Sequence, residues 1–226
     1  MRPHLAAAAA AIAVFALCST APRASAQLTP SLPIRFGFEG GANLTHASGT
    51  QINDVSNRNG WIGGVTLELP LPNQWSFETG ALYALKGWTR VEPQTGDRAV
   101  AKLDYVEIPA LFRYEFRNPT PFTPFVGAGA SLSFQSGCGL SATTASTGET
   151  QNVSCTQAGQ LSGGQFGFYS FDWGALGAVG LAADVGRSRL SLGARYEYGL
   201  TNLQKHNDAR SRAVALTAGV SWPVRF

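Results

Sequence analysis

The last thirteen residues of the chain, Val214 to Phe226, read VALTAGVSWPVRF and alternate between two kinds of side chain. One face carries the apolar residues Val214, Leu216, Ala218, Val220, Trp222, Val224 and Phe226. The other face carries Ala215, Thr217, Gly219, Ser221 and Arg225. A period of two residues is typical of a β-strand with one apolar face. The segment therefore predicts an amphipathic strand that ends on an aromatic residue.

The same period recurs along the rest of the chain. Seven further segments predict strands over residues 34–44, 61–69, 75–86, 105–116, 126–135, 169–184 and 189–200. Leu82 and Ala84 interrupt the polar face of the third segment. Pro109 lies inside the fourth, where we expect a bulge or a locally unpaired position, because proline cannot donate to the ladder. The chain is therefore expected to contain eight strands.

The connections between these segments alternate in length. Long connections over 45–60, 87–101, 136–167 and 201–211 alternate with short ones over 70–74, 117–122 and 185–188. This alternation is typical of membrane barrels, which have short turns at the periplasmic end and longer loops outside. An even strand number places both chain ends on the short-turn side. The predicted fold is all-β, an eight-stranded antiparallel up-and-down transmembrane β-barrel with four long outside loops.

The polar faces of the predicted strands carry charges of both signs. Nine of these charged residues are expected in the barrel interior: Glu39, Glu68, Glu78, Lys86, Glu107, Arg113, Glu115, Arg195 and Glu197. In so narrow a barrel such side chains can fill the lumen and pair with one another. Aromatic residues near strand ends are expected to form interfacial girdles: Trp61, Trp75, Tyr114, Tyr198, Trp222 and Phe226. A soluble lipocalin-like barrel would invert both faces, and alternation alone does not separate the two folds.

The first residues have the three regions of a secretory signal peptide. Arg2 precedes an apolar run from Leu5 to Leu17, and Ala24-Ser25-Ala26 form a small-x-small cleavage site. The run is too short to span a bilayer comfortably, which disfavours a transmembrane anchor. We expect residues 1–26 to be removed by cleavage after Ala26, leaving 27–226 as the barrel domain. Export and barrel together predict the bacterial outer membrane, with its lipid bilayer as the surroundings.

The net charge bears on possible partners, and the cysteine content bears on the choice between a disulfide and a metal site. Removal of residues 1–26 takes away Arg2 and Arg23 and lowers the formal charge from +3 to about +1, which gives no electrostatic support to a nucleic-acid partner. Cys138 and Cys155 then remain in a segment rich in Ser, Thr, Gly and Gln. An oxidising compartment favours a disulfide between them. Metal binding is the alternative, but no His or Cys lies near enough in sequence to supply further ligands.

Three stretches carry a resemblance to a known family. They are Gly37 to Leu44 (GFEGGANL), Leu103 to Tyr114 (LDYVEIPALFRY) and Pro124 to Gly129 (PFVGAG). The chain resembles the PorT-like outer-membrane β-barrel family, also described as the porin family, and the Tyr-x-Glu-Ile-Pro segment is the most specific match. The resemblance implies a fold and a location but scarcely a function, since a barrel hosts many roles.

The end of the last strand carries a second resemblance. Trp222 and Phe226 close an amphipathic strand at the C-terminus, which resembles the signal by which outer-membrane assembly machinery recognises barrels. Signal peptide, alternating connections and this C-terminal strand together favour the membrane barrel over the lipocalin-like one.

Few residues of the sequence suggest a catalytic site. His206 and Asp208 could form a base and its orienting group with Ser211 nearby, and His46 lies in another predicted loop. Three polar residues in a polar loop are expected without any catalysis, so we expect no enzyme and no cofactor. The leading hypothesis is a non-enzymatic barrel whose loops, above all 136–167, contact something outside, or whose barrel supports a membrane assembly. A narrow pore and a loop-borne hydrolase are the alternatives.

Overall fold

The structure is a computed structural model, which describes residues 33–48, 55–117, 119–161, 170–201 and 210–224. The predicted signal peptide lies outside these residues. The described elements are β1 (Arg35–Ser48), β2 (Val55–Pro70), β3 (Trp75–Val91), β4 (Arg98–Glu115), β5 (Phe122–Thr143), β6 (Thr150–Ser154), α2 (Cys155–Leu161), β7 (Phe171–Val185), β8 (Ser188–Gly199) and β9 (Arg210–Pro223). Among the described residues, no helix has the length and apolar content needed to span a membrane.

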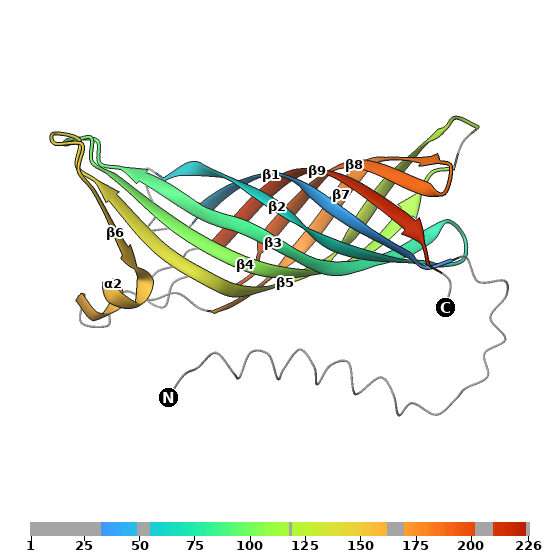
Figure 1. The fold of residues 1–226 in the computed structure, drawn as a ribbon, viewed down its shortest axis with the longest axis horizontal. Helices are drawn as coiled ribbons and strands as arrows, with labels where there is room; N and C mark the ends of the chain where they lie inside the picture. The colour runs from blue at the N-terminus through green and yellow to red at the C-terminus, as the bar shows by residue number, and fades with distance from the viewer. Residues whose placement is uncertain (1–32, 49–54, 118, 162–169, 202–209, 225–226) are drawn as a thin grey trace, which may run out of the picture. The chain divides into compact units, whose positions relative to one another are not determined.

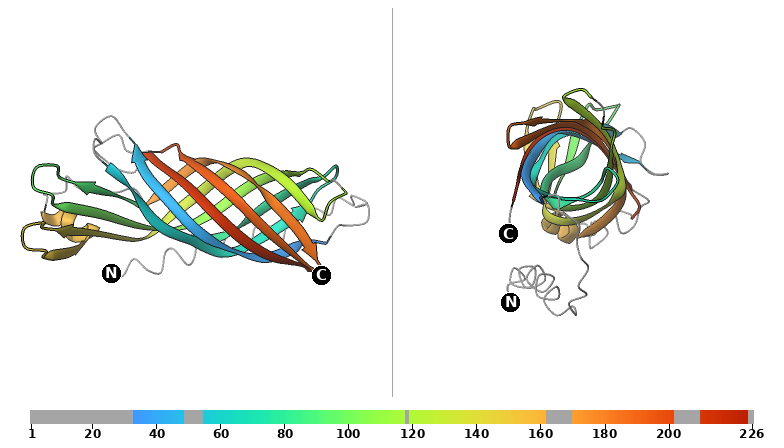
Figure 2. Two further views of the ribbon diagram at one scale, coloured as in Figure 1. Left: turned by 90° about the horizontal axis from the view of Figure 1, so that it is seen from above. Right: turned by 90° about the vertical axis from the view of Figure 1, so that its right-hand side faces the viewer.

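Eight of these strands close into a barrel (Figures 1 and 2). Each pairs antiparallel with its neighbour, and β1 pairs with β9 from Arg35↔Pro223 to Ser48↔Arg210. In the barrel wall β5 is followed directly by β7. β6 is not part of the wall and pairs with β5 at one end. The predicted eight-stranded antiparallel up-and-down barrel is therefore confirmed. We call the end that holds Arg35 and Pro223 the terminal end, and the opposite end the extended end.

The apolar face of the strands points away from the barrel axis. Leu192 and Leu216 are 64% and 62% exposed, whereas the interior positions of the same strands are mostly small or polar. Other exposed apolar side chains are Phe36, Phe38, Phe112, Val126, Leu132, Val179, Leu181, Leu190 and Val214. A soluble ligand-binding barrel would bury such side chains. The outward apolar band argues against the lipocalin-like alternative.

Aromatic pairs lie at both ends of this band. At the terminal end, the rings of Trp75 and Tyr114 lie 5.1 Å apart, and Trp222 contacts Phe38. At the extended end, the rings of Trp61 and Tyr83 lie 5.4 Å apart. Phe134 and Phe171 form a further pair there. Phe226, predicted as a girdle residue, lies outside the described residues.

The turns at the terminal end are short, as the sequence predicts. Val185 pairs with Ser188, so Gly186 and Arg187 alone connect β7 to β8. Gly186 has a φ of 64°, a left-handed conformation that favours glycine in tight hairpins. The turn between β2 and β3 uses Asn73 at a φ of 60°.

Strands at the extended end are longer than the sequence predicts. The expected bounds of the loops over 45–60, 87–101 and 136–167 are wrong. β1 runs to Ser48, β2 begins at Val55, β3 and β4 continue to a turn over 92–97, and β5 continues to Thr143. That turn is closed by the amide of Glu92, which donates to the carbonyl of Asp97 at 2.8 Å. At the extended end, the strands stay paired through their backbones beyond the residues in which apolar and polar side chains alternate. The segments 49–54, 162–169 and 202–209 are not described, so the number of long loops stays a prediction.

The described strands have two shifts of register, and neither is at Pro109. One lies between Asn57 and Ile62 of β2, and the other is a bulge in β5. Asp104 pairs with Gly137 and Tyr105 with Gln135, which leaves Ser136 as the extra residue in β5. Pro109 pairs with Ser131 on the β5 side, and pairing with β3 is interrupted there without a change of register. The sequence left open either a bulge or a locally unpaired position at Pro109. The structure has the locally unpaired position, because proline has no amide hydrogen to donate to β3 and no extra residue is needed opposite it.

Beyond the bulge, five strands continue as an open sheet, because Val55 to Asn57 of β2 pair with Arg90 to Trp88 of β3. Gly139 to Thr143 of β5 pair with β4 on one side and with β6 on the other. Figure 1 shows β3, β4, β5 and β6 running past the ends of β7, β8 and β9, with α2 after β6. We call this part, residues 55–57, 87–91, 98–103, 137–143 and 150–154, the extension sheet.

Candidate functional site

The nine charged residues predicted for the interior all occupy inward positions on the barrel strands. They come from alternate positions of β1, β2, β3, β4 and β8, so strand alternation alone directs them to one space. Lys86 and Glu107 are each only 2% exposed. Isolated charges at such burial would be strongly destabilising, so their partners decide what the interior can do.

The cluster nearest the extended end is built around one lysine. The Nζ atom of Lys86 lies 2.6 Å from Oε2 of Glu197 and 3.2 Å from Oε2 of Glu107. Ser131 donates to the other oxygen of Glu197 at 2.8 Å, and Lys86 donates to Ser133 at 3.3 Å. One ammonium group therefore holds two buried carboxylates.

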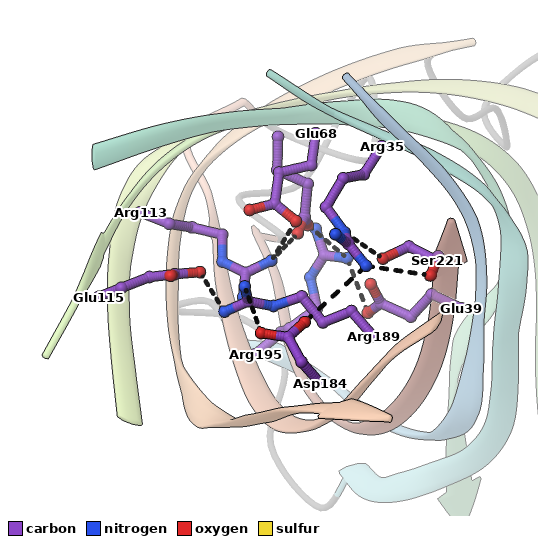
Figure 3. Close-up of polar contacts among 10 residues, drawn as sticks. Arg35, Glu39, Glu68, Arg113, Glu115, Asp184, Arg189, Arg195 and Ser221 are labelled. Carbon is purple, nitrogen blue, oxygen red and sulfur yellow. Dashed lines mark hydrogen bonds and ion pairs between the residues drawn. The ribbon is translucent and has the colours of Figure 1, made fainter. Parts of the chain in front are cut away.

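The middle of the lumen is filled by two arginines (Figure 3). Arg113 donates to Glu78 at 2.5 Å, and its guanidinium lies 3.8 Å from the ring centre of Phe125. Arg195 donates to Glu39 at 3.0 Å and lies 3.9 Å from Glu78. A carboxylate shared between two planar guanidinium groups links strands on opposite sides of the barrel.

The cluster at the terminal end includes residues that the predicted set omits. Arg189 donates to Glu115 at 2.6 Å and lies 3.7 Å from Asp184 (Figure 3). Arg35 lies 3.9 Å from Asp184 and donates to Ser221. Arg35 and Arg189 hold inward positions in the alternation, so that signal could have found them. Asp184 is a strand-end residue whose side chain is 61% exposed, which alternation does not single out.

These three clusters leave little space inside the barrel. The cavity beside Arg113 and Arg195 measures about 20 Å³, and the one lined by Asn43 and Glu107 about 10 Å³. A single water needs roughly 10–15 Å³. A larger cavity of about 100 Å³ lies at the terminal end, next to Arg35. Within the described part of the chain, the lumen is a packed ion-pair network.

Of the residues considered for hydrolysis, the structure describes only Ser211 and His46. His206 and Asp208 lie outside the described residues. Ser211 is 4% exposed and faces inward, whereas His46 is at an outward position of β1. In the described ranges, no group of three or more His, Cys, Asp or Glu side chains could hold a metal ion.

Most of the chain is similar to a known protein family. A family model described as outer membrane protein beta-barrel domain matches residues 25–205. The chain belongs to this family. This outer membrane barrel therefore sits in the lipid bilayer of the bacterial outer membrane. No curated protein matches its sequence.

Several solved structures of outer membrane barrels are similar to this one. Neisserial surface protein A shares 18% identity over 84% of this chain and 97% of its own, with a TM-score of 0.45. E. coli outer membrane protein W shares 16% identity over 87% and 100%, with a TM-score of 0.44. The outer membrane enzyme PagL shares 14% identity over 82% and 99%, with a TM-score of 0.38.

The extension sheet of this outer membrane barrel stands beyond the bilayer. A tilted strand crosses the hydrocarbon in about 9–11 residues. β5 has 22 residues and β4 has 18, so about half of each lies past the membrane at the extended end. Both described chain ends lie at the other, terminal end (Figure 2).

Three kinds of contact hold the extension sheet together. A disulfide joins Cys138 of β5 to Cys155 at the start of α2, with the Cα atoms 5.5 Å apart. The hydroxyl of Ser141 donates to the Asn152 side chain at 2.5 Å. The turn after β5 is tied to the β3–β4 turn, because the amide of Ala145 donates to Asp97 at 2.8 Å. Both hairpins are thus held as one unit.

Replacing both cysteines with serine (Cys138→Ser, Cys155→Ser) is expected to loosen α2 without unfolding the barrel. The bond closes a loop with a sequence separation of 17, which corresponds to about 3 kcal/mol of chain entropy. We expect faster proteolysis after α2 and an unchanged urea midpoint for the barrel. A lower barrel midpoint would contradict a purely local role for the disulfide.

Proposed function

We propose that this protein is a non-enzymatic outer membrane barrel that holds a rigid extracellular sheet for contact with a partner. The observation that carries the proposal is the extension sheet, which continues five paired strands into the space outside the cell. Its seven residues beyond the bulge in β5, 137–143, rise about 23 Å. The disulfide and the tip contact between Ala145 and Asp97 order it before any partner binds.

The interior supports this proposal by disfavouring a pore. Arg113, Arg195 and their carboxylates occupy the cross-section of the lumen, and the cavities beside them have room for single waters. Conduction would require these ion pairs to separate within a low-dielectric wall. Such separation is costly because each charge would lose its partner while buried.

A photoreactive amino acid placed in the extension sheet tests the proposal in intact cells. Position 151 on β6 is exposed, and position 187 in the β7–β8 turn is an exposed control at the periplasmic end. We expect a defined adduct of higher mass from position 151 that position 187 does not form. The adduct should weaken in the Cys138→Ser, Cys155→Ser variant. Adducts absent from positions 147 and 151 alike would overturn the proposal.

Planar-bilayer recordings address the pore alternative directly. We expect no conductance steps from the folded protein. Steps that persist after purification, and that change when Arg113 is replaced, would favour a narrow pore over an interaction role. The two experiments are independent, because the first reports on the outer surface and the second on the lumen.

The proposal includes the finer assignments drawn from the sequence. The PorT-like branch is supported by the Tyr105–Pro109 segment, whose Tyr105, Glu107 and Pro109 side chains are all buried on the inner face of β4. We propose cleavage after Ala26, which mass measurement of the protein recovered from outer membranes would test. Trp222, at the terminal end of β9, and Phe226 are proposed as the contact for assembly machinery. Deletion of Phe226 should then lower the amount of folded barrel in the membrane.

A further inference from the structure

Two arginines lie on the outer wall of the barrel, away from the lumen. Arg210 and Arg212 occupy exposed, outward positions at the start of β9. Arg212 pairs with Tyr198 of β8 on one side and with His46 of β1 on the other. The Arg212 guanidinium lies 5.2 Å from the centre of the Tyr198 ring, and both arginines interact with the phenol group. The four side chains form one patch, which we call the β9 basic patch.

The charges of the β9 basic patch are not neutralised by the described part of the chain. Each buried arginine of the lumen lies within 4 Å of a carboxylate. Arg210 and Arg212 form no ion pair with any described carboxylate. The Nδ1 atom of His46 is covered but has no hydrogen-bond partner among the described residues. The patch therefore presents the positive charge of Arg210 and Arg212 to whatever lies outside the wall.

The depth of the patch follows from the length of β9. The outward side chain of Trp222 marks the periplasmic girdle, and Leu216 and Val214 follow on the same face. The ten residues from Trp222 to Arg212 rise about 33 Å along the strand. At a tilt of about 40° this is about 25 Å across the bilayer, which equals the height of the apolar band. Arg212 therefore lies where the hydrocarbon ends on the outer side.

Lipid head groups, and not a soluble partner, are the neighbours of the wall at this depth. Basic residues beside a membrane surface attract anionic head groups. The planar fork of arginine matches phosphate oxygens better than a point charge does. We propose that the β9 basic patch binds the phosphate of a lipid in the outer leaflet, with Arg210 and Arg212 as the charged donors and His46 at its edge. This inference rests on the membrane position of the barrel and is independent of the extension sheet.

Native mass spectrometry of the detergent-solubilised, folded protein titrated with phosphatidic acid tests the proposal. Wild-type protein should retain one phosphatidic acid more tightly than phosphatidylcholine. The Arg210→Gln, Arg212→Gln variant should bind it about 25-fold more weakly, at about fivefold for each arginine next to an anionic surface. The matched control is Arg90→Gln, Arg98→Gln, which removes the same charge from exposed positions of the extension sheet. It should bind as the wild type does.

Three kinds of result would contradict the proposed lipid-phosphate site. Equal affinity in the wild type and the Arg210→Gln, Arg212→Gln variant, or equal loss in the control, would overturn the site. Equal binding of oleic acid would overturn recognition of phosphate. Competition by inorganic phosphate at the same concentration would show a soluble-anion site instead of a lipid site. Gel migration with and without heating verifies that every variant is folded, and Arg210→Lys, Arg212→Lys should retain part of the affinity.

Discussion

Replacing Lys86 with methionine is expected to lower the free energy of unfolding of the barrel by about 3–5 kcal/mol, because one partner of a buried pair is removed. The Nζ atom of Lys86 lies 2.6 Å from Glu197 and 3.2 Å from Glu107, and no other cation lies within 4 Å of either carboxylate among the described residues. The change leaves both carboxylates buried and without compensation. Urea unfolding in lipid vesicles, followed by tryptophan fluorescence, measures the effect.

Two further variants separate the charge effect from general damage. Lys102→Met removes an exposed lysine from the other face of the neighbouring strand, and its effect should stay within about 0.5 kcal/mol. The triple variant Lys86→Met, Glu107→Gln, Glu197→Gln removes the charges together and should recover much of the loss. A triple variant no more stable than Lys86→Met would show that packing, and not unpaired charge, controls stability at this position.

Replacing Leu192 with arginine is expected to destabilise the folded barrel in vesicles by about 2–4 kcal/mol, because the charge enters the hydrocarbon. Leu192 is 64% exposed on the outer wall, between the periplasmic turn at Gly186 and the outer girdle at Tyr198. In water the same change would be harmless, since the side chain already faces outward. The variant therefore measures the surroundings of the wall.

The control for this prediction lies in the extension sheet. Val91 is 40% exposed at the end of β3, beyond the bilayer, so Val91→Arg should leave the urea midpoint and the yield of folded protein unchanged. Equal small effects of Leu192→Arg and Val91→Arg would place the outer wall in water and remove the basis for the proposed lipid site.

The patterns that predicted the barrel are local ones. In β9, Val214 and Leu216 point outward while Ala215 and Thr217 point inward, as their alternation predicts. Alternation is informative here because lipid and a polar lumen differ strongly on the two sides of the wall. The same reason places Glu107 and Arg113 inside from sequence alone.

In the extension sheet this signal disappears, because polar side chains stand on both faces, with Thr89 on the buried face and Arg90 on the exposed one. Residues 87–101 lack apolar alternation, and the sequence therefore predicts a loop where β3 and β4 in fact stay paired to Val91 and Arg98. Neither side excludes polar residues there, but the backbone groups can still satisfy one another. The bulge at Ser136 was equally hidden, because register depends on the partner strand.

By itself, the sequence determined the number of barrel strands, the face of each of them and the identity of most interior charges, because these follow from a two-residue period. Only the tertiary structure decided which charges meet, such as Lys86 with Glu197 and Arg189 with Glu115. Those pairs join strands that are distant in the chain, and the stagger and curvature of the closed barrel bring them together. Closure also placed Arg212 beside Tyr198 and His46 on the outer wall, which no stretch of the sequence shows alone.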